Sequence, residues 1–248
     1  MSEASTIEWT EATWNPVSGC EQVSPGCDHC YAMKFAERFR GVPRHYYSTG
    51  FDVTLRPNML DRPGTWKKPR FIFVNSMSDL FHRFVSDDYI DEVFNRMERF
   101  DWHVYQLLTK RPERMRRYVK DRYSERPIPI QIWLGTSIES NDYAWRADML
   151  RECNAAVRFL SIEPMLGPVN RVSLEGISWV IAGGESGPGR RPMESQWVRD
   201  VRDRCTSTGV AFFFKQWHKA GTGRMLDGRT WDEMPDVGIR PALLGHVS

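Results

Sequence analysis

The chain has 248 residues and a mass of 29.0 kDa, which suits one α/β domain or two small ones. Its composition, 41% hydrophobic and 27% charged, provides enough apolar side chain for a large core and excludes a disordered or collagen-like chain. With 34 Lys and Arg against 32 Asp and Glu, the net charge of +2 neither requires nor excludes a nucleic-acid partner.

The first residues, MSEASTIEWTEATW, are acidic and polar, whereas a signal peptide starts with a basic region followed by an apolar one. No run of 18 apolar residues occurs, so no membrane-spanning segment is expected. The five cysteines, an odd number, fit thiolate ligands in a reducing compartment better than a disulfide framework. We therefore expect a cytoplasmic protein without membrane association.

Three of the cysteines lie close together in a loop that we place at 18–31. Two residues separate Cys27 from Cys30, a spacing that lets two thiolates bind one metal centre, and Pro25-Gly26 provides a turn that brings Cys20 alongside. A [4Fe–4S] cluster held by three thiolates keeps one iron open for an exogenous ligand. The spacing therefore favours a cluster site.

Two other interpretations of these cysteines stay open. A structural zinc site would need a fourth ligand, which His29 or His45 could supply, and the third interpretation is a set of unligated reactive thiols. The remaining cysteines, Cys153 and Cys205, occur in helix-like segments and are expected to be small buried residues rather than ligands.

After residue 70 the chain repeats one pattern, a short apolar run rich in β-branched and aromatic residues that ends in polar residues. The pattern predicts strands at 71–76, 103–109, 130–136, 157–161, 178–183 and 210–215. Their starts are roughly 20 to 30 residues apart, about the length of a strand and a crossover helix, so we expect parallel strands.

Helix start signals lie between most of these strands. Helices are predicted after Ser86, Pro112, Ser140 and Ser195, and one near Tyr31, whereas 162–177 should cross over as a loop. The alternation predicts a single-domain α/β protein over 1–248, a parallel (β/α) barrel or partial TIM barrel with a C-terminal extension at about 218–248. A doubly wound open sheet is the alternative.

Polar side chains follow the end of each predicted strand. In a parallel barrel all these ends meet at the C-terminal face, where barrel enzymes place their chemistry. The candidate site residues, in chain order, are Ser76, Ser78, Asp79, Lys110, Arg111, Ser137, Glu139, Glu163, Glu185 and Lys215.

Several motifs together resemble a known family. The segments Trp14-Asn-Pro-Val-Ser-Gly-Cys20, Ser24-Pro-Gly-Cys27 and Cys30-Tyr-Ala resemble the three-cysteine-motif proteins of phages and bacteria, the family named for phage gene products thirty-seven and sixty-eight, which is similar to radical S-adenosylmethionine (SAM) enzymes. Later segments extend the resemblance over nearly the whole chain, among them Ser78-Asp-Leu-Phe-His82, Leu108-Thr-Lys-Arg-Pro112 and Gly183-Gly-Glu-Ser-Gly-Pro188. The chain departs from the common radical-SAM pattern in having six residues between its first two cysteines instead of three, and His29 instead of an aromatic residue before the last.

The resemblance implies a [4Fe–4S] cluster bound by Cys20, Cys27 and Cys30, with SAM on the open iron. One-electron reduction would cleave SAM to methionine and a 5′-deoxyadenosyl radical, and the electron would come from a donor of the flavodoxin or ferredoxin type. From strand order we expect the amino-acid part of SAM to contact Ser76, Ser78, Asp79 and Lys110 or Arg111, its ribose Ser137 or Glu139, and the catalytic residues to be Glu163, Glu185 and Lys215.

The substrate is predicted from basic and aromatic residues. Clusters at 67–70, 110–111, 114–117 and 190–191, with Trp66, Trp217 and His218 as stacking surfaces, favour modification or repair of a nucleic acid or nucleotide over a peptide or small metabolite. A protein encoded nearby is a further expected partner. Two alternatives remain: a zinc- or cluster-stabilised nucleic-acid-binding protein without radical chemistry, and a barrel hydrolase using Glu139, Glu163 and Glu185.

Overall fold

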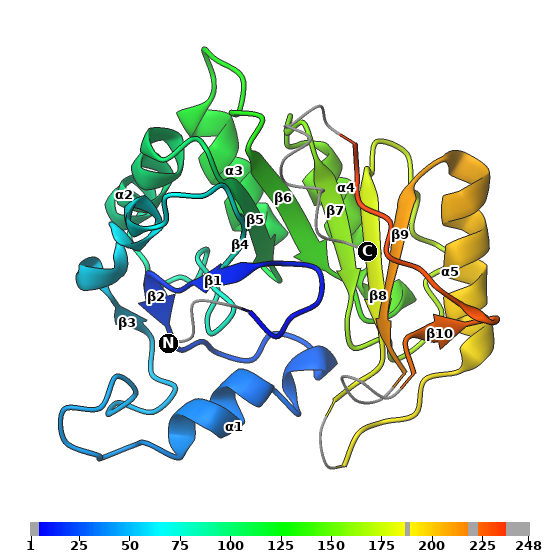
Figure 1. The fold of residues 1–248 in the computed structure, drawn as a ribbon, viewed down its shortest axis with the longest axis horizontal. Coiled ribbons are helices and arrows are strands. Elements are labelled where there is room, and N and C mark those ends of the chain that lie inside the picture. Colours follow the sequence, from blue (N-terminus) through cyan, green and yellow to red (C-terminus); the bar gives the residue numbers. More distant parts are fainter. Residues whose placement is uncertain (1–4, 187–188, 218–222, 237–248) are drawn as a thin grey trace.

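The computed structural model describes residues 5–186, 189–217 and 223–236. Its centre is a sheet of seven parallel strands (Figure 1), in the order β1 (Ala12–Trp14), β4 (Phe71–Val74), β5 (Val104–Thr109), β6 (Ile132–Ser137), β7 (Arg158–Ile162), β8 (Trp179–Gly183) and β9 (Ala211–Gln216). Each strand pairs with the next strand of this sheet along the chain, so the order never reverses. This order excludes the doubly wound alternative, which requires a reversal.

The sheet curves into part of a barrel. Its edge strands β1 and β9 do not pair with each other within the described residues, so a full barrel is not formed there. The predicted α/β class with a parallel partial barrel is confirmed. The six predicted strands all occur, with ends shifted by one or two residues.

Strand β1 was not predicted from the sequence. It has only three residues, and its register, with Ala12 opposite Ile72 and Trp14 opposite Val74, extends the sheet beyond β4. A run this short, ended by Asn15-Pro16, carries too little periodicity to be recognised.

Helices cover the outer face of the sheet (Figure 1): α2 (Asp87–Arg99), α3 (Pro112–Arg122), α4 (Trp145–Arg151) and α5 (Ser195–Thr208). Ser86 caps α2 by accepting a hydrogen bond from the backbone of Tyr89, as its position predicts. Ser195 does not cap α5 but is its first residue, and Glu194 holds the cap position. The connection from β7 to β8 contains no helix, as predicted.

Several shorter elements lie outside the seven-stranded sheet and its covering helices. Helix α1 (Tyr31–Glu37) follows the cysteine loop, and β2 (Val17–Ser18) pairs with β3 (Thr54–Leu55). A small hairpin of β10 (Met225–Leu226) and β11 (Arg229–Thr230) lies in the predicted C-terminal extension, of which 223–236 are described and 218–222 and 237–248 are not. No helix in the described ranges has the length and hydropathy needed to cross a membrane.

Aromatic rings fill the concave side of the sheet near the amino ends of its strands. Trp9 inserts there from the N-terminal segment and meets Phe73 at 4.7 Å and Trp179 edge-on at 6.0 Å. Gly135 on β6 has no room for a side chain, since an added Cβ would lie 2.4 Å from the ring of Phe159. This packing forms the floor beneath a hollow at the carboxyl ends of the strands.

Candidate functional site

A cavity of about 440 Å³ opens at the carboxyl ends of the strands. The three clustered cysteines line one wall, and Trp9, Phe73 and Leu108 contribute to its floor. Most predicted site residues also line it: Ser76, Ser78, Asp79, Lys110, Arg111, Ser137, Glu163, Glu185 and Lys215.

The cysteine wall is built by two short helical turns. Pro25–Cys27 forms a 3₁₀ turn in which the Cys27 amide donates to the Ser24 carbonyl at 2.8 Å, and Cys30 precedes the first residue of α1. These turns place the three thiols, each half-buried, on the same cavity. Cys153 and Cys205 are fully buried in the outer core and do not line the cavity.

The three thiols match the protein ligands of a [4Fe–4S] cluster with one open iron. In the described ranges no three His, Cys, Asp or Glu side chains are grouped closely enough to hold one metal ion. In a [4Fe–4S] cluster each cysteine binds a different iron. Of the two candidate fourth ligands for zinc, His29 lines the cavity and contacts Glu185 only through Nδ1, which leaves Nε2 for a metal, whereas His45 does not line the cavity and stacks on Phe39 with 3.8 Å between ring centroids.

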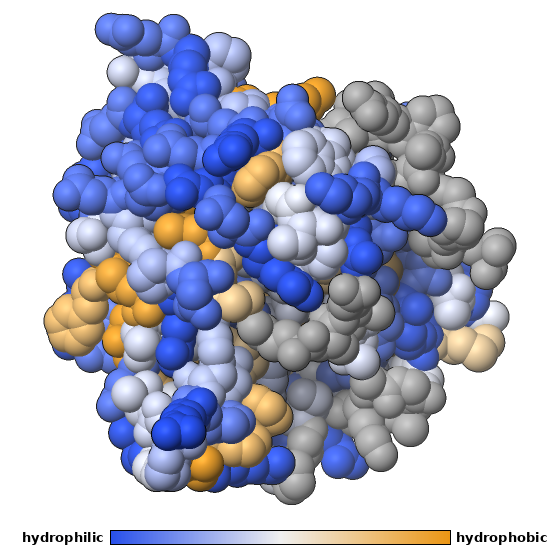
Figure 2. Space-filling view, turned by 60° about the vertical axis from the view of Figure 1, so that its left-hand side comes forward, coloured by the Kyte–Doolittle hydropathy of each residue, from blue (hydrophilic) through white to orange (hydrophobic). Residues whose placement is uncertain are grey.

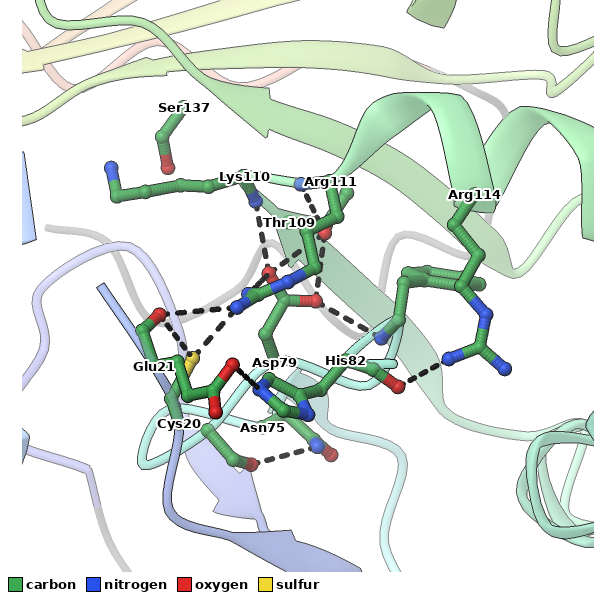
Figure 3. A network of polar contacts seen from close by, with 12 residues as sticks. Cys20, Glu21, Asn75, Asp79, His82, Thr109, Lys110, Arg111, Arg114 and Ser137 are labelled. Atoms are coloured by element: carbon green, nitrogen blue, oxygen red, sulfur yellow. Dashed lines mark hydrogen bonds and ion pairs between the residues drawn. The ribbon is translucent and has the colours of Figure 1, made fainter. Parts of the chain in front are cut away.

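Asp79 is fully occupied by donors from the chain (Figure 3). Its carboxylate accepts from the Thr109 hydroxyl at 2.7 and 2.9 Å, the backbone amides of Phe81 and Lys110, and Nη1 of Arg111 at 3.0 Å. The side chain is nearly buried. Asp79, which is predicted to bind the SAM ammonium, lines the cavity, and its oxygens hold the end of β5 and orient Arg111.

Glu139 was predicted to lie in the site, but it is not among the residues that line the cavity. Its side chain is 1% exposed, and its Oε1 accepts from Lys110 Nζ at 2.7 Å and from the Ser24 hydroxyl at 2.7 Å, while Oε2 accepts from Arg146. An added Cβ on Gly26 would lie 2.4 Å from the same Oε1. Glu139 therefore anchors the cysteine loop to the end of β6 instead of reaching a ribose.

Glu185 lines the cavity but also anchors the cysteine loop. It pairs with Arg191 at 2.5 Å and lies 2.9 Å from Nδ1 of His29, and Arg191 in turn donates to the Pro25 carbonyl. Burial alone would raise the pKa of Glu185, but the hydrogen bonds from Arg191 and His29 lower it to about 2. An anion so held is a poor proton donor, so a catalytic role for Glu185, which stays a prediction, would not be that of a general acid.

Glu163 and Lys215 form the pair that remains free to act in the cavity. Lys215 Nζ lies 3.1 Å from Glu163 Oε1, and both side chains are partly exposed. The Ser137 hydroxyl makes no hydrogen bond within the described residues, while that of Ser78 is taken by the Val17 carbonyl. Of the predicted site residues, Glu163, Lys215 and Ser137 thus present the most available polar groups.

Sequence reasoning missed two residues of this site. Tyr31 donates from its hydroxyl to the Ser76 carbonyl at 2.6 Å, which joins α1 to the end of β4. Asn75 lines the cavity with a left-handed backbone, φ 62°, and its buried Oδ1 has no hydrogen-bond partner. The sequence signal for Tyr31 was its position directly after Cys30, and that for Asn75 was its position directly after the apolar run of a predicted strand.

Several basic and aromatic residues predicted to bind a nucleic acid are placed away from the cavity. Lys67 and Lys68 precede β4, so they lie toward the amino ends of the strands, and Trp66 is buried in the core. The Trp217 indole donates to the Met225 carbonyl, and His218 lies outside the described residues. These parts of the sequence prediction do not contribute to the site.

A curved parallel sheet with a cysteine-lined cavity at its carboxyl ends defines an α/β partial-barrel protein with a candidate cluster site. The chain belongs to the family described as "protein of unknown function (DUF5131)", which matches residues 4–235. That description does not mention phages, so it gives no support to the phage part of the resemblance. No curated protein matches the chain.

A search of solved structures finds "Spore photoproduct lyase complexed with dinucleoside spore photoproduct", with a TM-score of 0.46 and 12% sequence identity. The similarity covers 76% of this chain and 58% of that chain. This chain therefore spans little more than half the length of that protein.

Proposed function

We propose that this protein is a radical-SAM-like iron–sulfur enzyme that reductively cleaves SAM and acts on a nucleic acid or nucleotide, as modification or repair. One observation carries the proposal: three thiols from one short loop face a single cavity at the carboxyl ends of a parallel sheet. The six-residue spacer between Cys20 and Cys27, longer than the three residues of the common radical-SAM pattern, still allows the three thiols to face one cavity, because the 3₁₀ turn at Pro25–Cys27 folds the spacer back.

The chain's own residues divide into ligands, anchors and reacting groups. Cys20, Cys27 and Cys30 would hold the cluster, which together with SAM supplies the one-electron cleavage. Glu139 and Glu185 hold the loop that carries them. A loop fixed from two strand ends keeps the thiols on the cavity wall, as a preorganised site requires.

Ligand contacts are assigned to the groups left available. The Ser137 hydroxyl, without a protein partner among the described residues, can bond a ribose hydroxyl of SAM. Lys215, held by its ion pair with Glu163, can donate a hydrogen bond from Nζ to the substrate. Arg111 stays beside Cys20, so we assign the carboxylate of SAM to Lys110, which lines the cavity and whose ammonium has N–H donors beyond the one bonded to Glu139.

The test is anaerobic reconstitution followed by iron and sulfide analysis and EPR. We expect brown protein with cluster stoichiometry, an EPR signal that changes on adding SAM, and 5′-deoxyadenosine and methionine on adding dithionite. Cys30→Ala should abolish all three, and Cys205→Ala, away from the cavity, should abolish none. Colourless protein with stoichiometric zinc, or a loaded cluster that neither responds to SAM nor yields 5′-deoxyadenosine, would refute the proposal.

A further inference from the structure

One face of α1 alternates aromatic rings with cations. Tyr31, Lys34, Phe35 and Arg38 are spaced i, i+3, i+4 and i+7, and all four are exposed, whereas Ala32 and Ala36 on the opposite face are buried. Tyr31 is 54% exposed and Phe35 44%. Most of the surface in Figure 2 is hydrophilic, with hydrophobic side chains in scattered groups.

The cations of this face are free to bind a partner. Lys34, Arg38 and the nearby Arg44 form no ion pair within the described residues. Glu37 and Asp52 nearby both pair with Arg40, which leaves one negative charge uncompensated against the three positive charges of Lys34, Arg38 and Arg44. The face therefore carries a local positive charge even though the net charge of the chain is only +2.

The rings are held in place and lead into the cavity. Phe35 packs edge-on against Phe39 and Tyr47, with ring centroids 5.3 and 5.6 Å apart, so its position is fixed before any partner binds. Tyr31 is anchored through its hydroxyl to the Ser76 carbonyl and lines the same cavity as the three cysteines. A partner on this face thus reaches the cavity directly, which is what a substrate has to do.

We propose that the exposed face of α1, formed by Tyr31, Lys34, Phe35 and Arg38, binds a single-stranded nucleic acid and guides one of its bases into the cysteine-lined cavity. Rings interleaved with cations suit stacked bases and phosphates, whereas the rings would find no exposed bases on a duplex. This inference rests on the proposed function for the reaction but names the form of the substrate and where it binds. The binding itself requires neither cluster nor SAM.

The experiment is fluorescence polarisation of the full-length protein, as purified, with a labelled single-stranded oligonucleotide and with the same sequence as a duplex. We expect tighter binding of the single strand. Lys34→Gln combined with Arg38→Gln should weaken it about tenfold at low salt and reduce the salt slope by about 1.4, since two phosphate contacts are lost. The matched control, Lys67→Gln with Lys68→Gln, removes the same charge from exposed residues toward the amino ends of the strands and should change affinity less than twofold.

A second variant tests the rings independently of charge. Phe35→Leu keeps an apolar side chain but removes the stacking surface, and should weaken single-strand binding severalfold without changing the salt slope. Equal losses in the α1 variant and the control, a preference for duplex, or no binding at all would each overturn the inference. So would a result in which the α1 variant binds oligonucleotide normally but accepts electrons more slowly from a reduced flavodoxin, because the face would then serve an acidic protein.

The two proposals can fail separately. Protein that holds a cluster and cleaves SAM, yet binds no oligonucleotide through α1, would overturn this inference and leave the proposed reaction standing. Protein that binds single strands through α1 but retains no iron would overturn the proposed reaction and leave the binding of single strands by α1 standing.

Discussion

Nη1 of Arg111 donates to the sulfur of Cys20 at 3.4 Å, and the same nitrogen lies 3.0 Å from Oδ2 of Asp79. Burial and the charge of Asp79 raise the pKa of the Cys20 thiol to about 11, against the opposing effect of Arg111. In the metal-free protein this thiol is therefore protonated at neutral pH. A metal centre has to displace the proton, so we expect its binding to be favoured by alkaline conditions.

The first prediction concerns the stability provided by Asp79. Asp79→Ala leaves the half-buried Arg111 guanidinium and the Thr109 hydroxyl without their acceptor, so the free energy of unfolding in urea should fall by about 3 kcal/mol. The control is Asp148→Ala, which removes an exposed Asp that also pairs with a single Arg and should cost under about 1 kcal/mol. Similar losses from both variants would contradict the structural role of Asp79.

The second prediction separates ligand from structural cysteines. Cys27→Ala should lose its iron after anaerobic reconstitution, measured by colorimetric iron analysis, because one of three protein ligands is missing. Cys153→Ala should keep iron, since its thiol is fully buried against the outer core. Equal loss of iron from the two variants would show that the cysteines are wrongly assigned.

The third prediction addresses the contact between Gly26 and Glu139. In Gly26→Ala the new methyl group collides with a carboxylate that Lys110, Arg146 and Ser24 hold in place, so the cysteine loop must shift. We expect iron content to fall severalfold with little change in the far-ultraviolet circular dichroism spectrum. Gly167→Ala, whose Cβ would meet only Ser140 at 3.2 Å, is the control and should retain iron.

The fourth prediction is a pH dependence set by Glu185. Its pKa of about 2 in the folded protein lies below its ordinary value of 4.5, so its contribution to stability is complete above about pH 5 and decreases as the pH falls toward 2. Glu185→Gln should therefore be less stable than the wild-type protein at pH 7, and the difference should shrink below pH 4.5. Urea unfolding from pH 7 to pH 3.5 measures this, and a difference that grows on acidification would exclude the assignment.

Local sequence was enough to predict most of the architecture. Each strand of the β4 to β9 series is a short apolar run with a polar end, and each spacing has room for one crossover, so the parallel pairing follows from chain length alone. Ser86 marks a helix start because it accepts from a backbone amide three residues away, and Pro112 because its own fixed φ suits the first turn. Strand β1 could not be predicted, because its three residues become a strand only through pairing with β4.

The sequence by itself also determined which cysteines share a site, since Cys27 and Cys30 are neighbours through local turns and α1 follows them directly. Only the tertiary structure decided what the charged strand ends do. Glu139 and Glu163 follow neighbouring strands in similar contexts, yet Glu139 is enclosed by Lys110, Arg146 and the cysteine loop, whereas Glu163 faces the cavity. The roles of such carboxylates depend on donors that are distant in the chain, because a charge is neutralised by whichever partner the fold brings within about 3 Å.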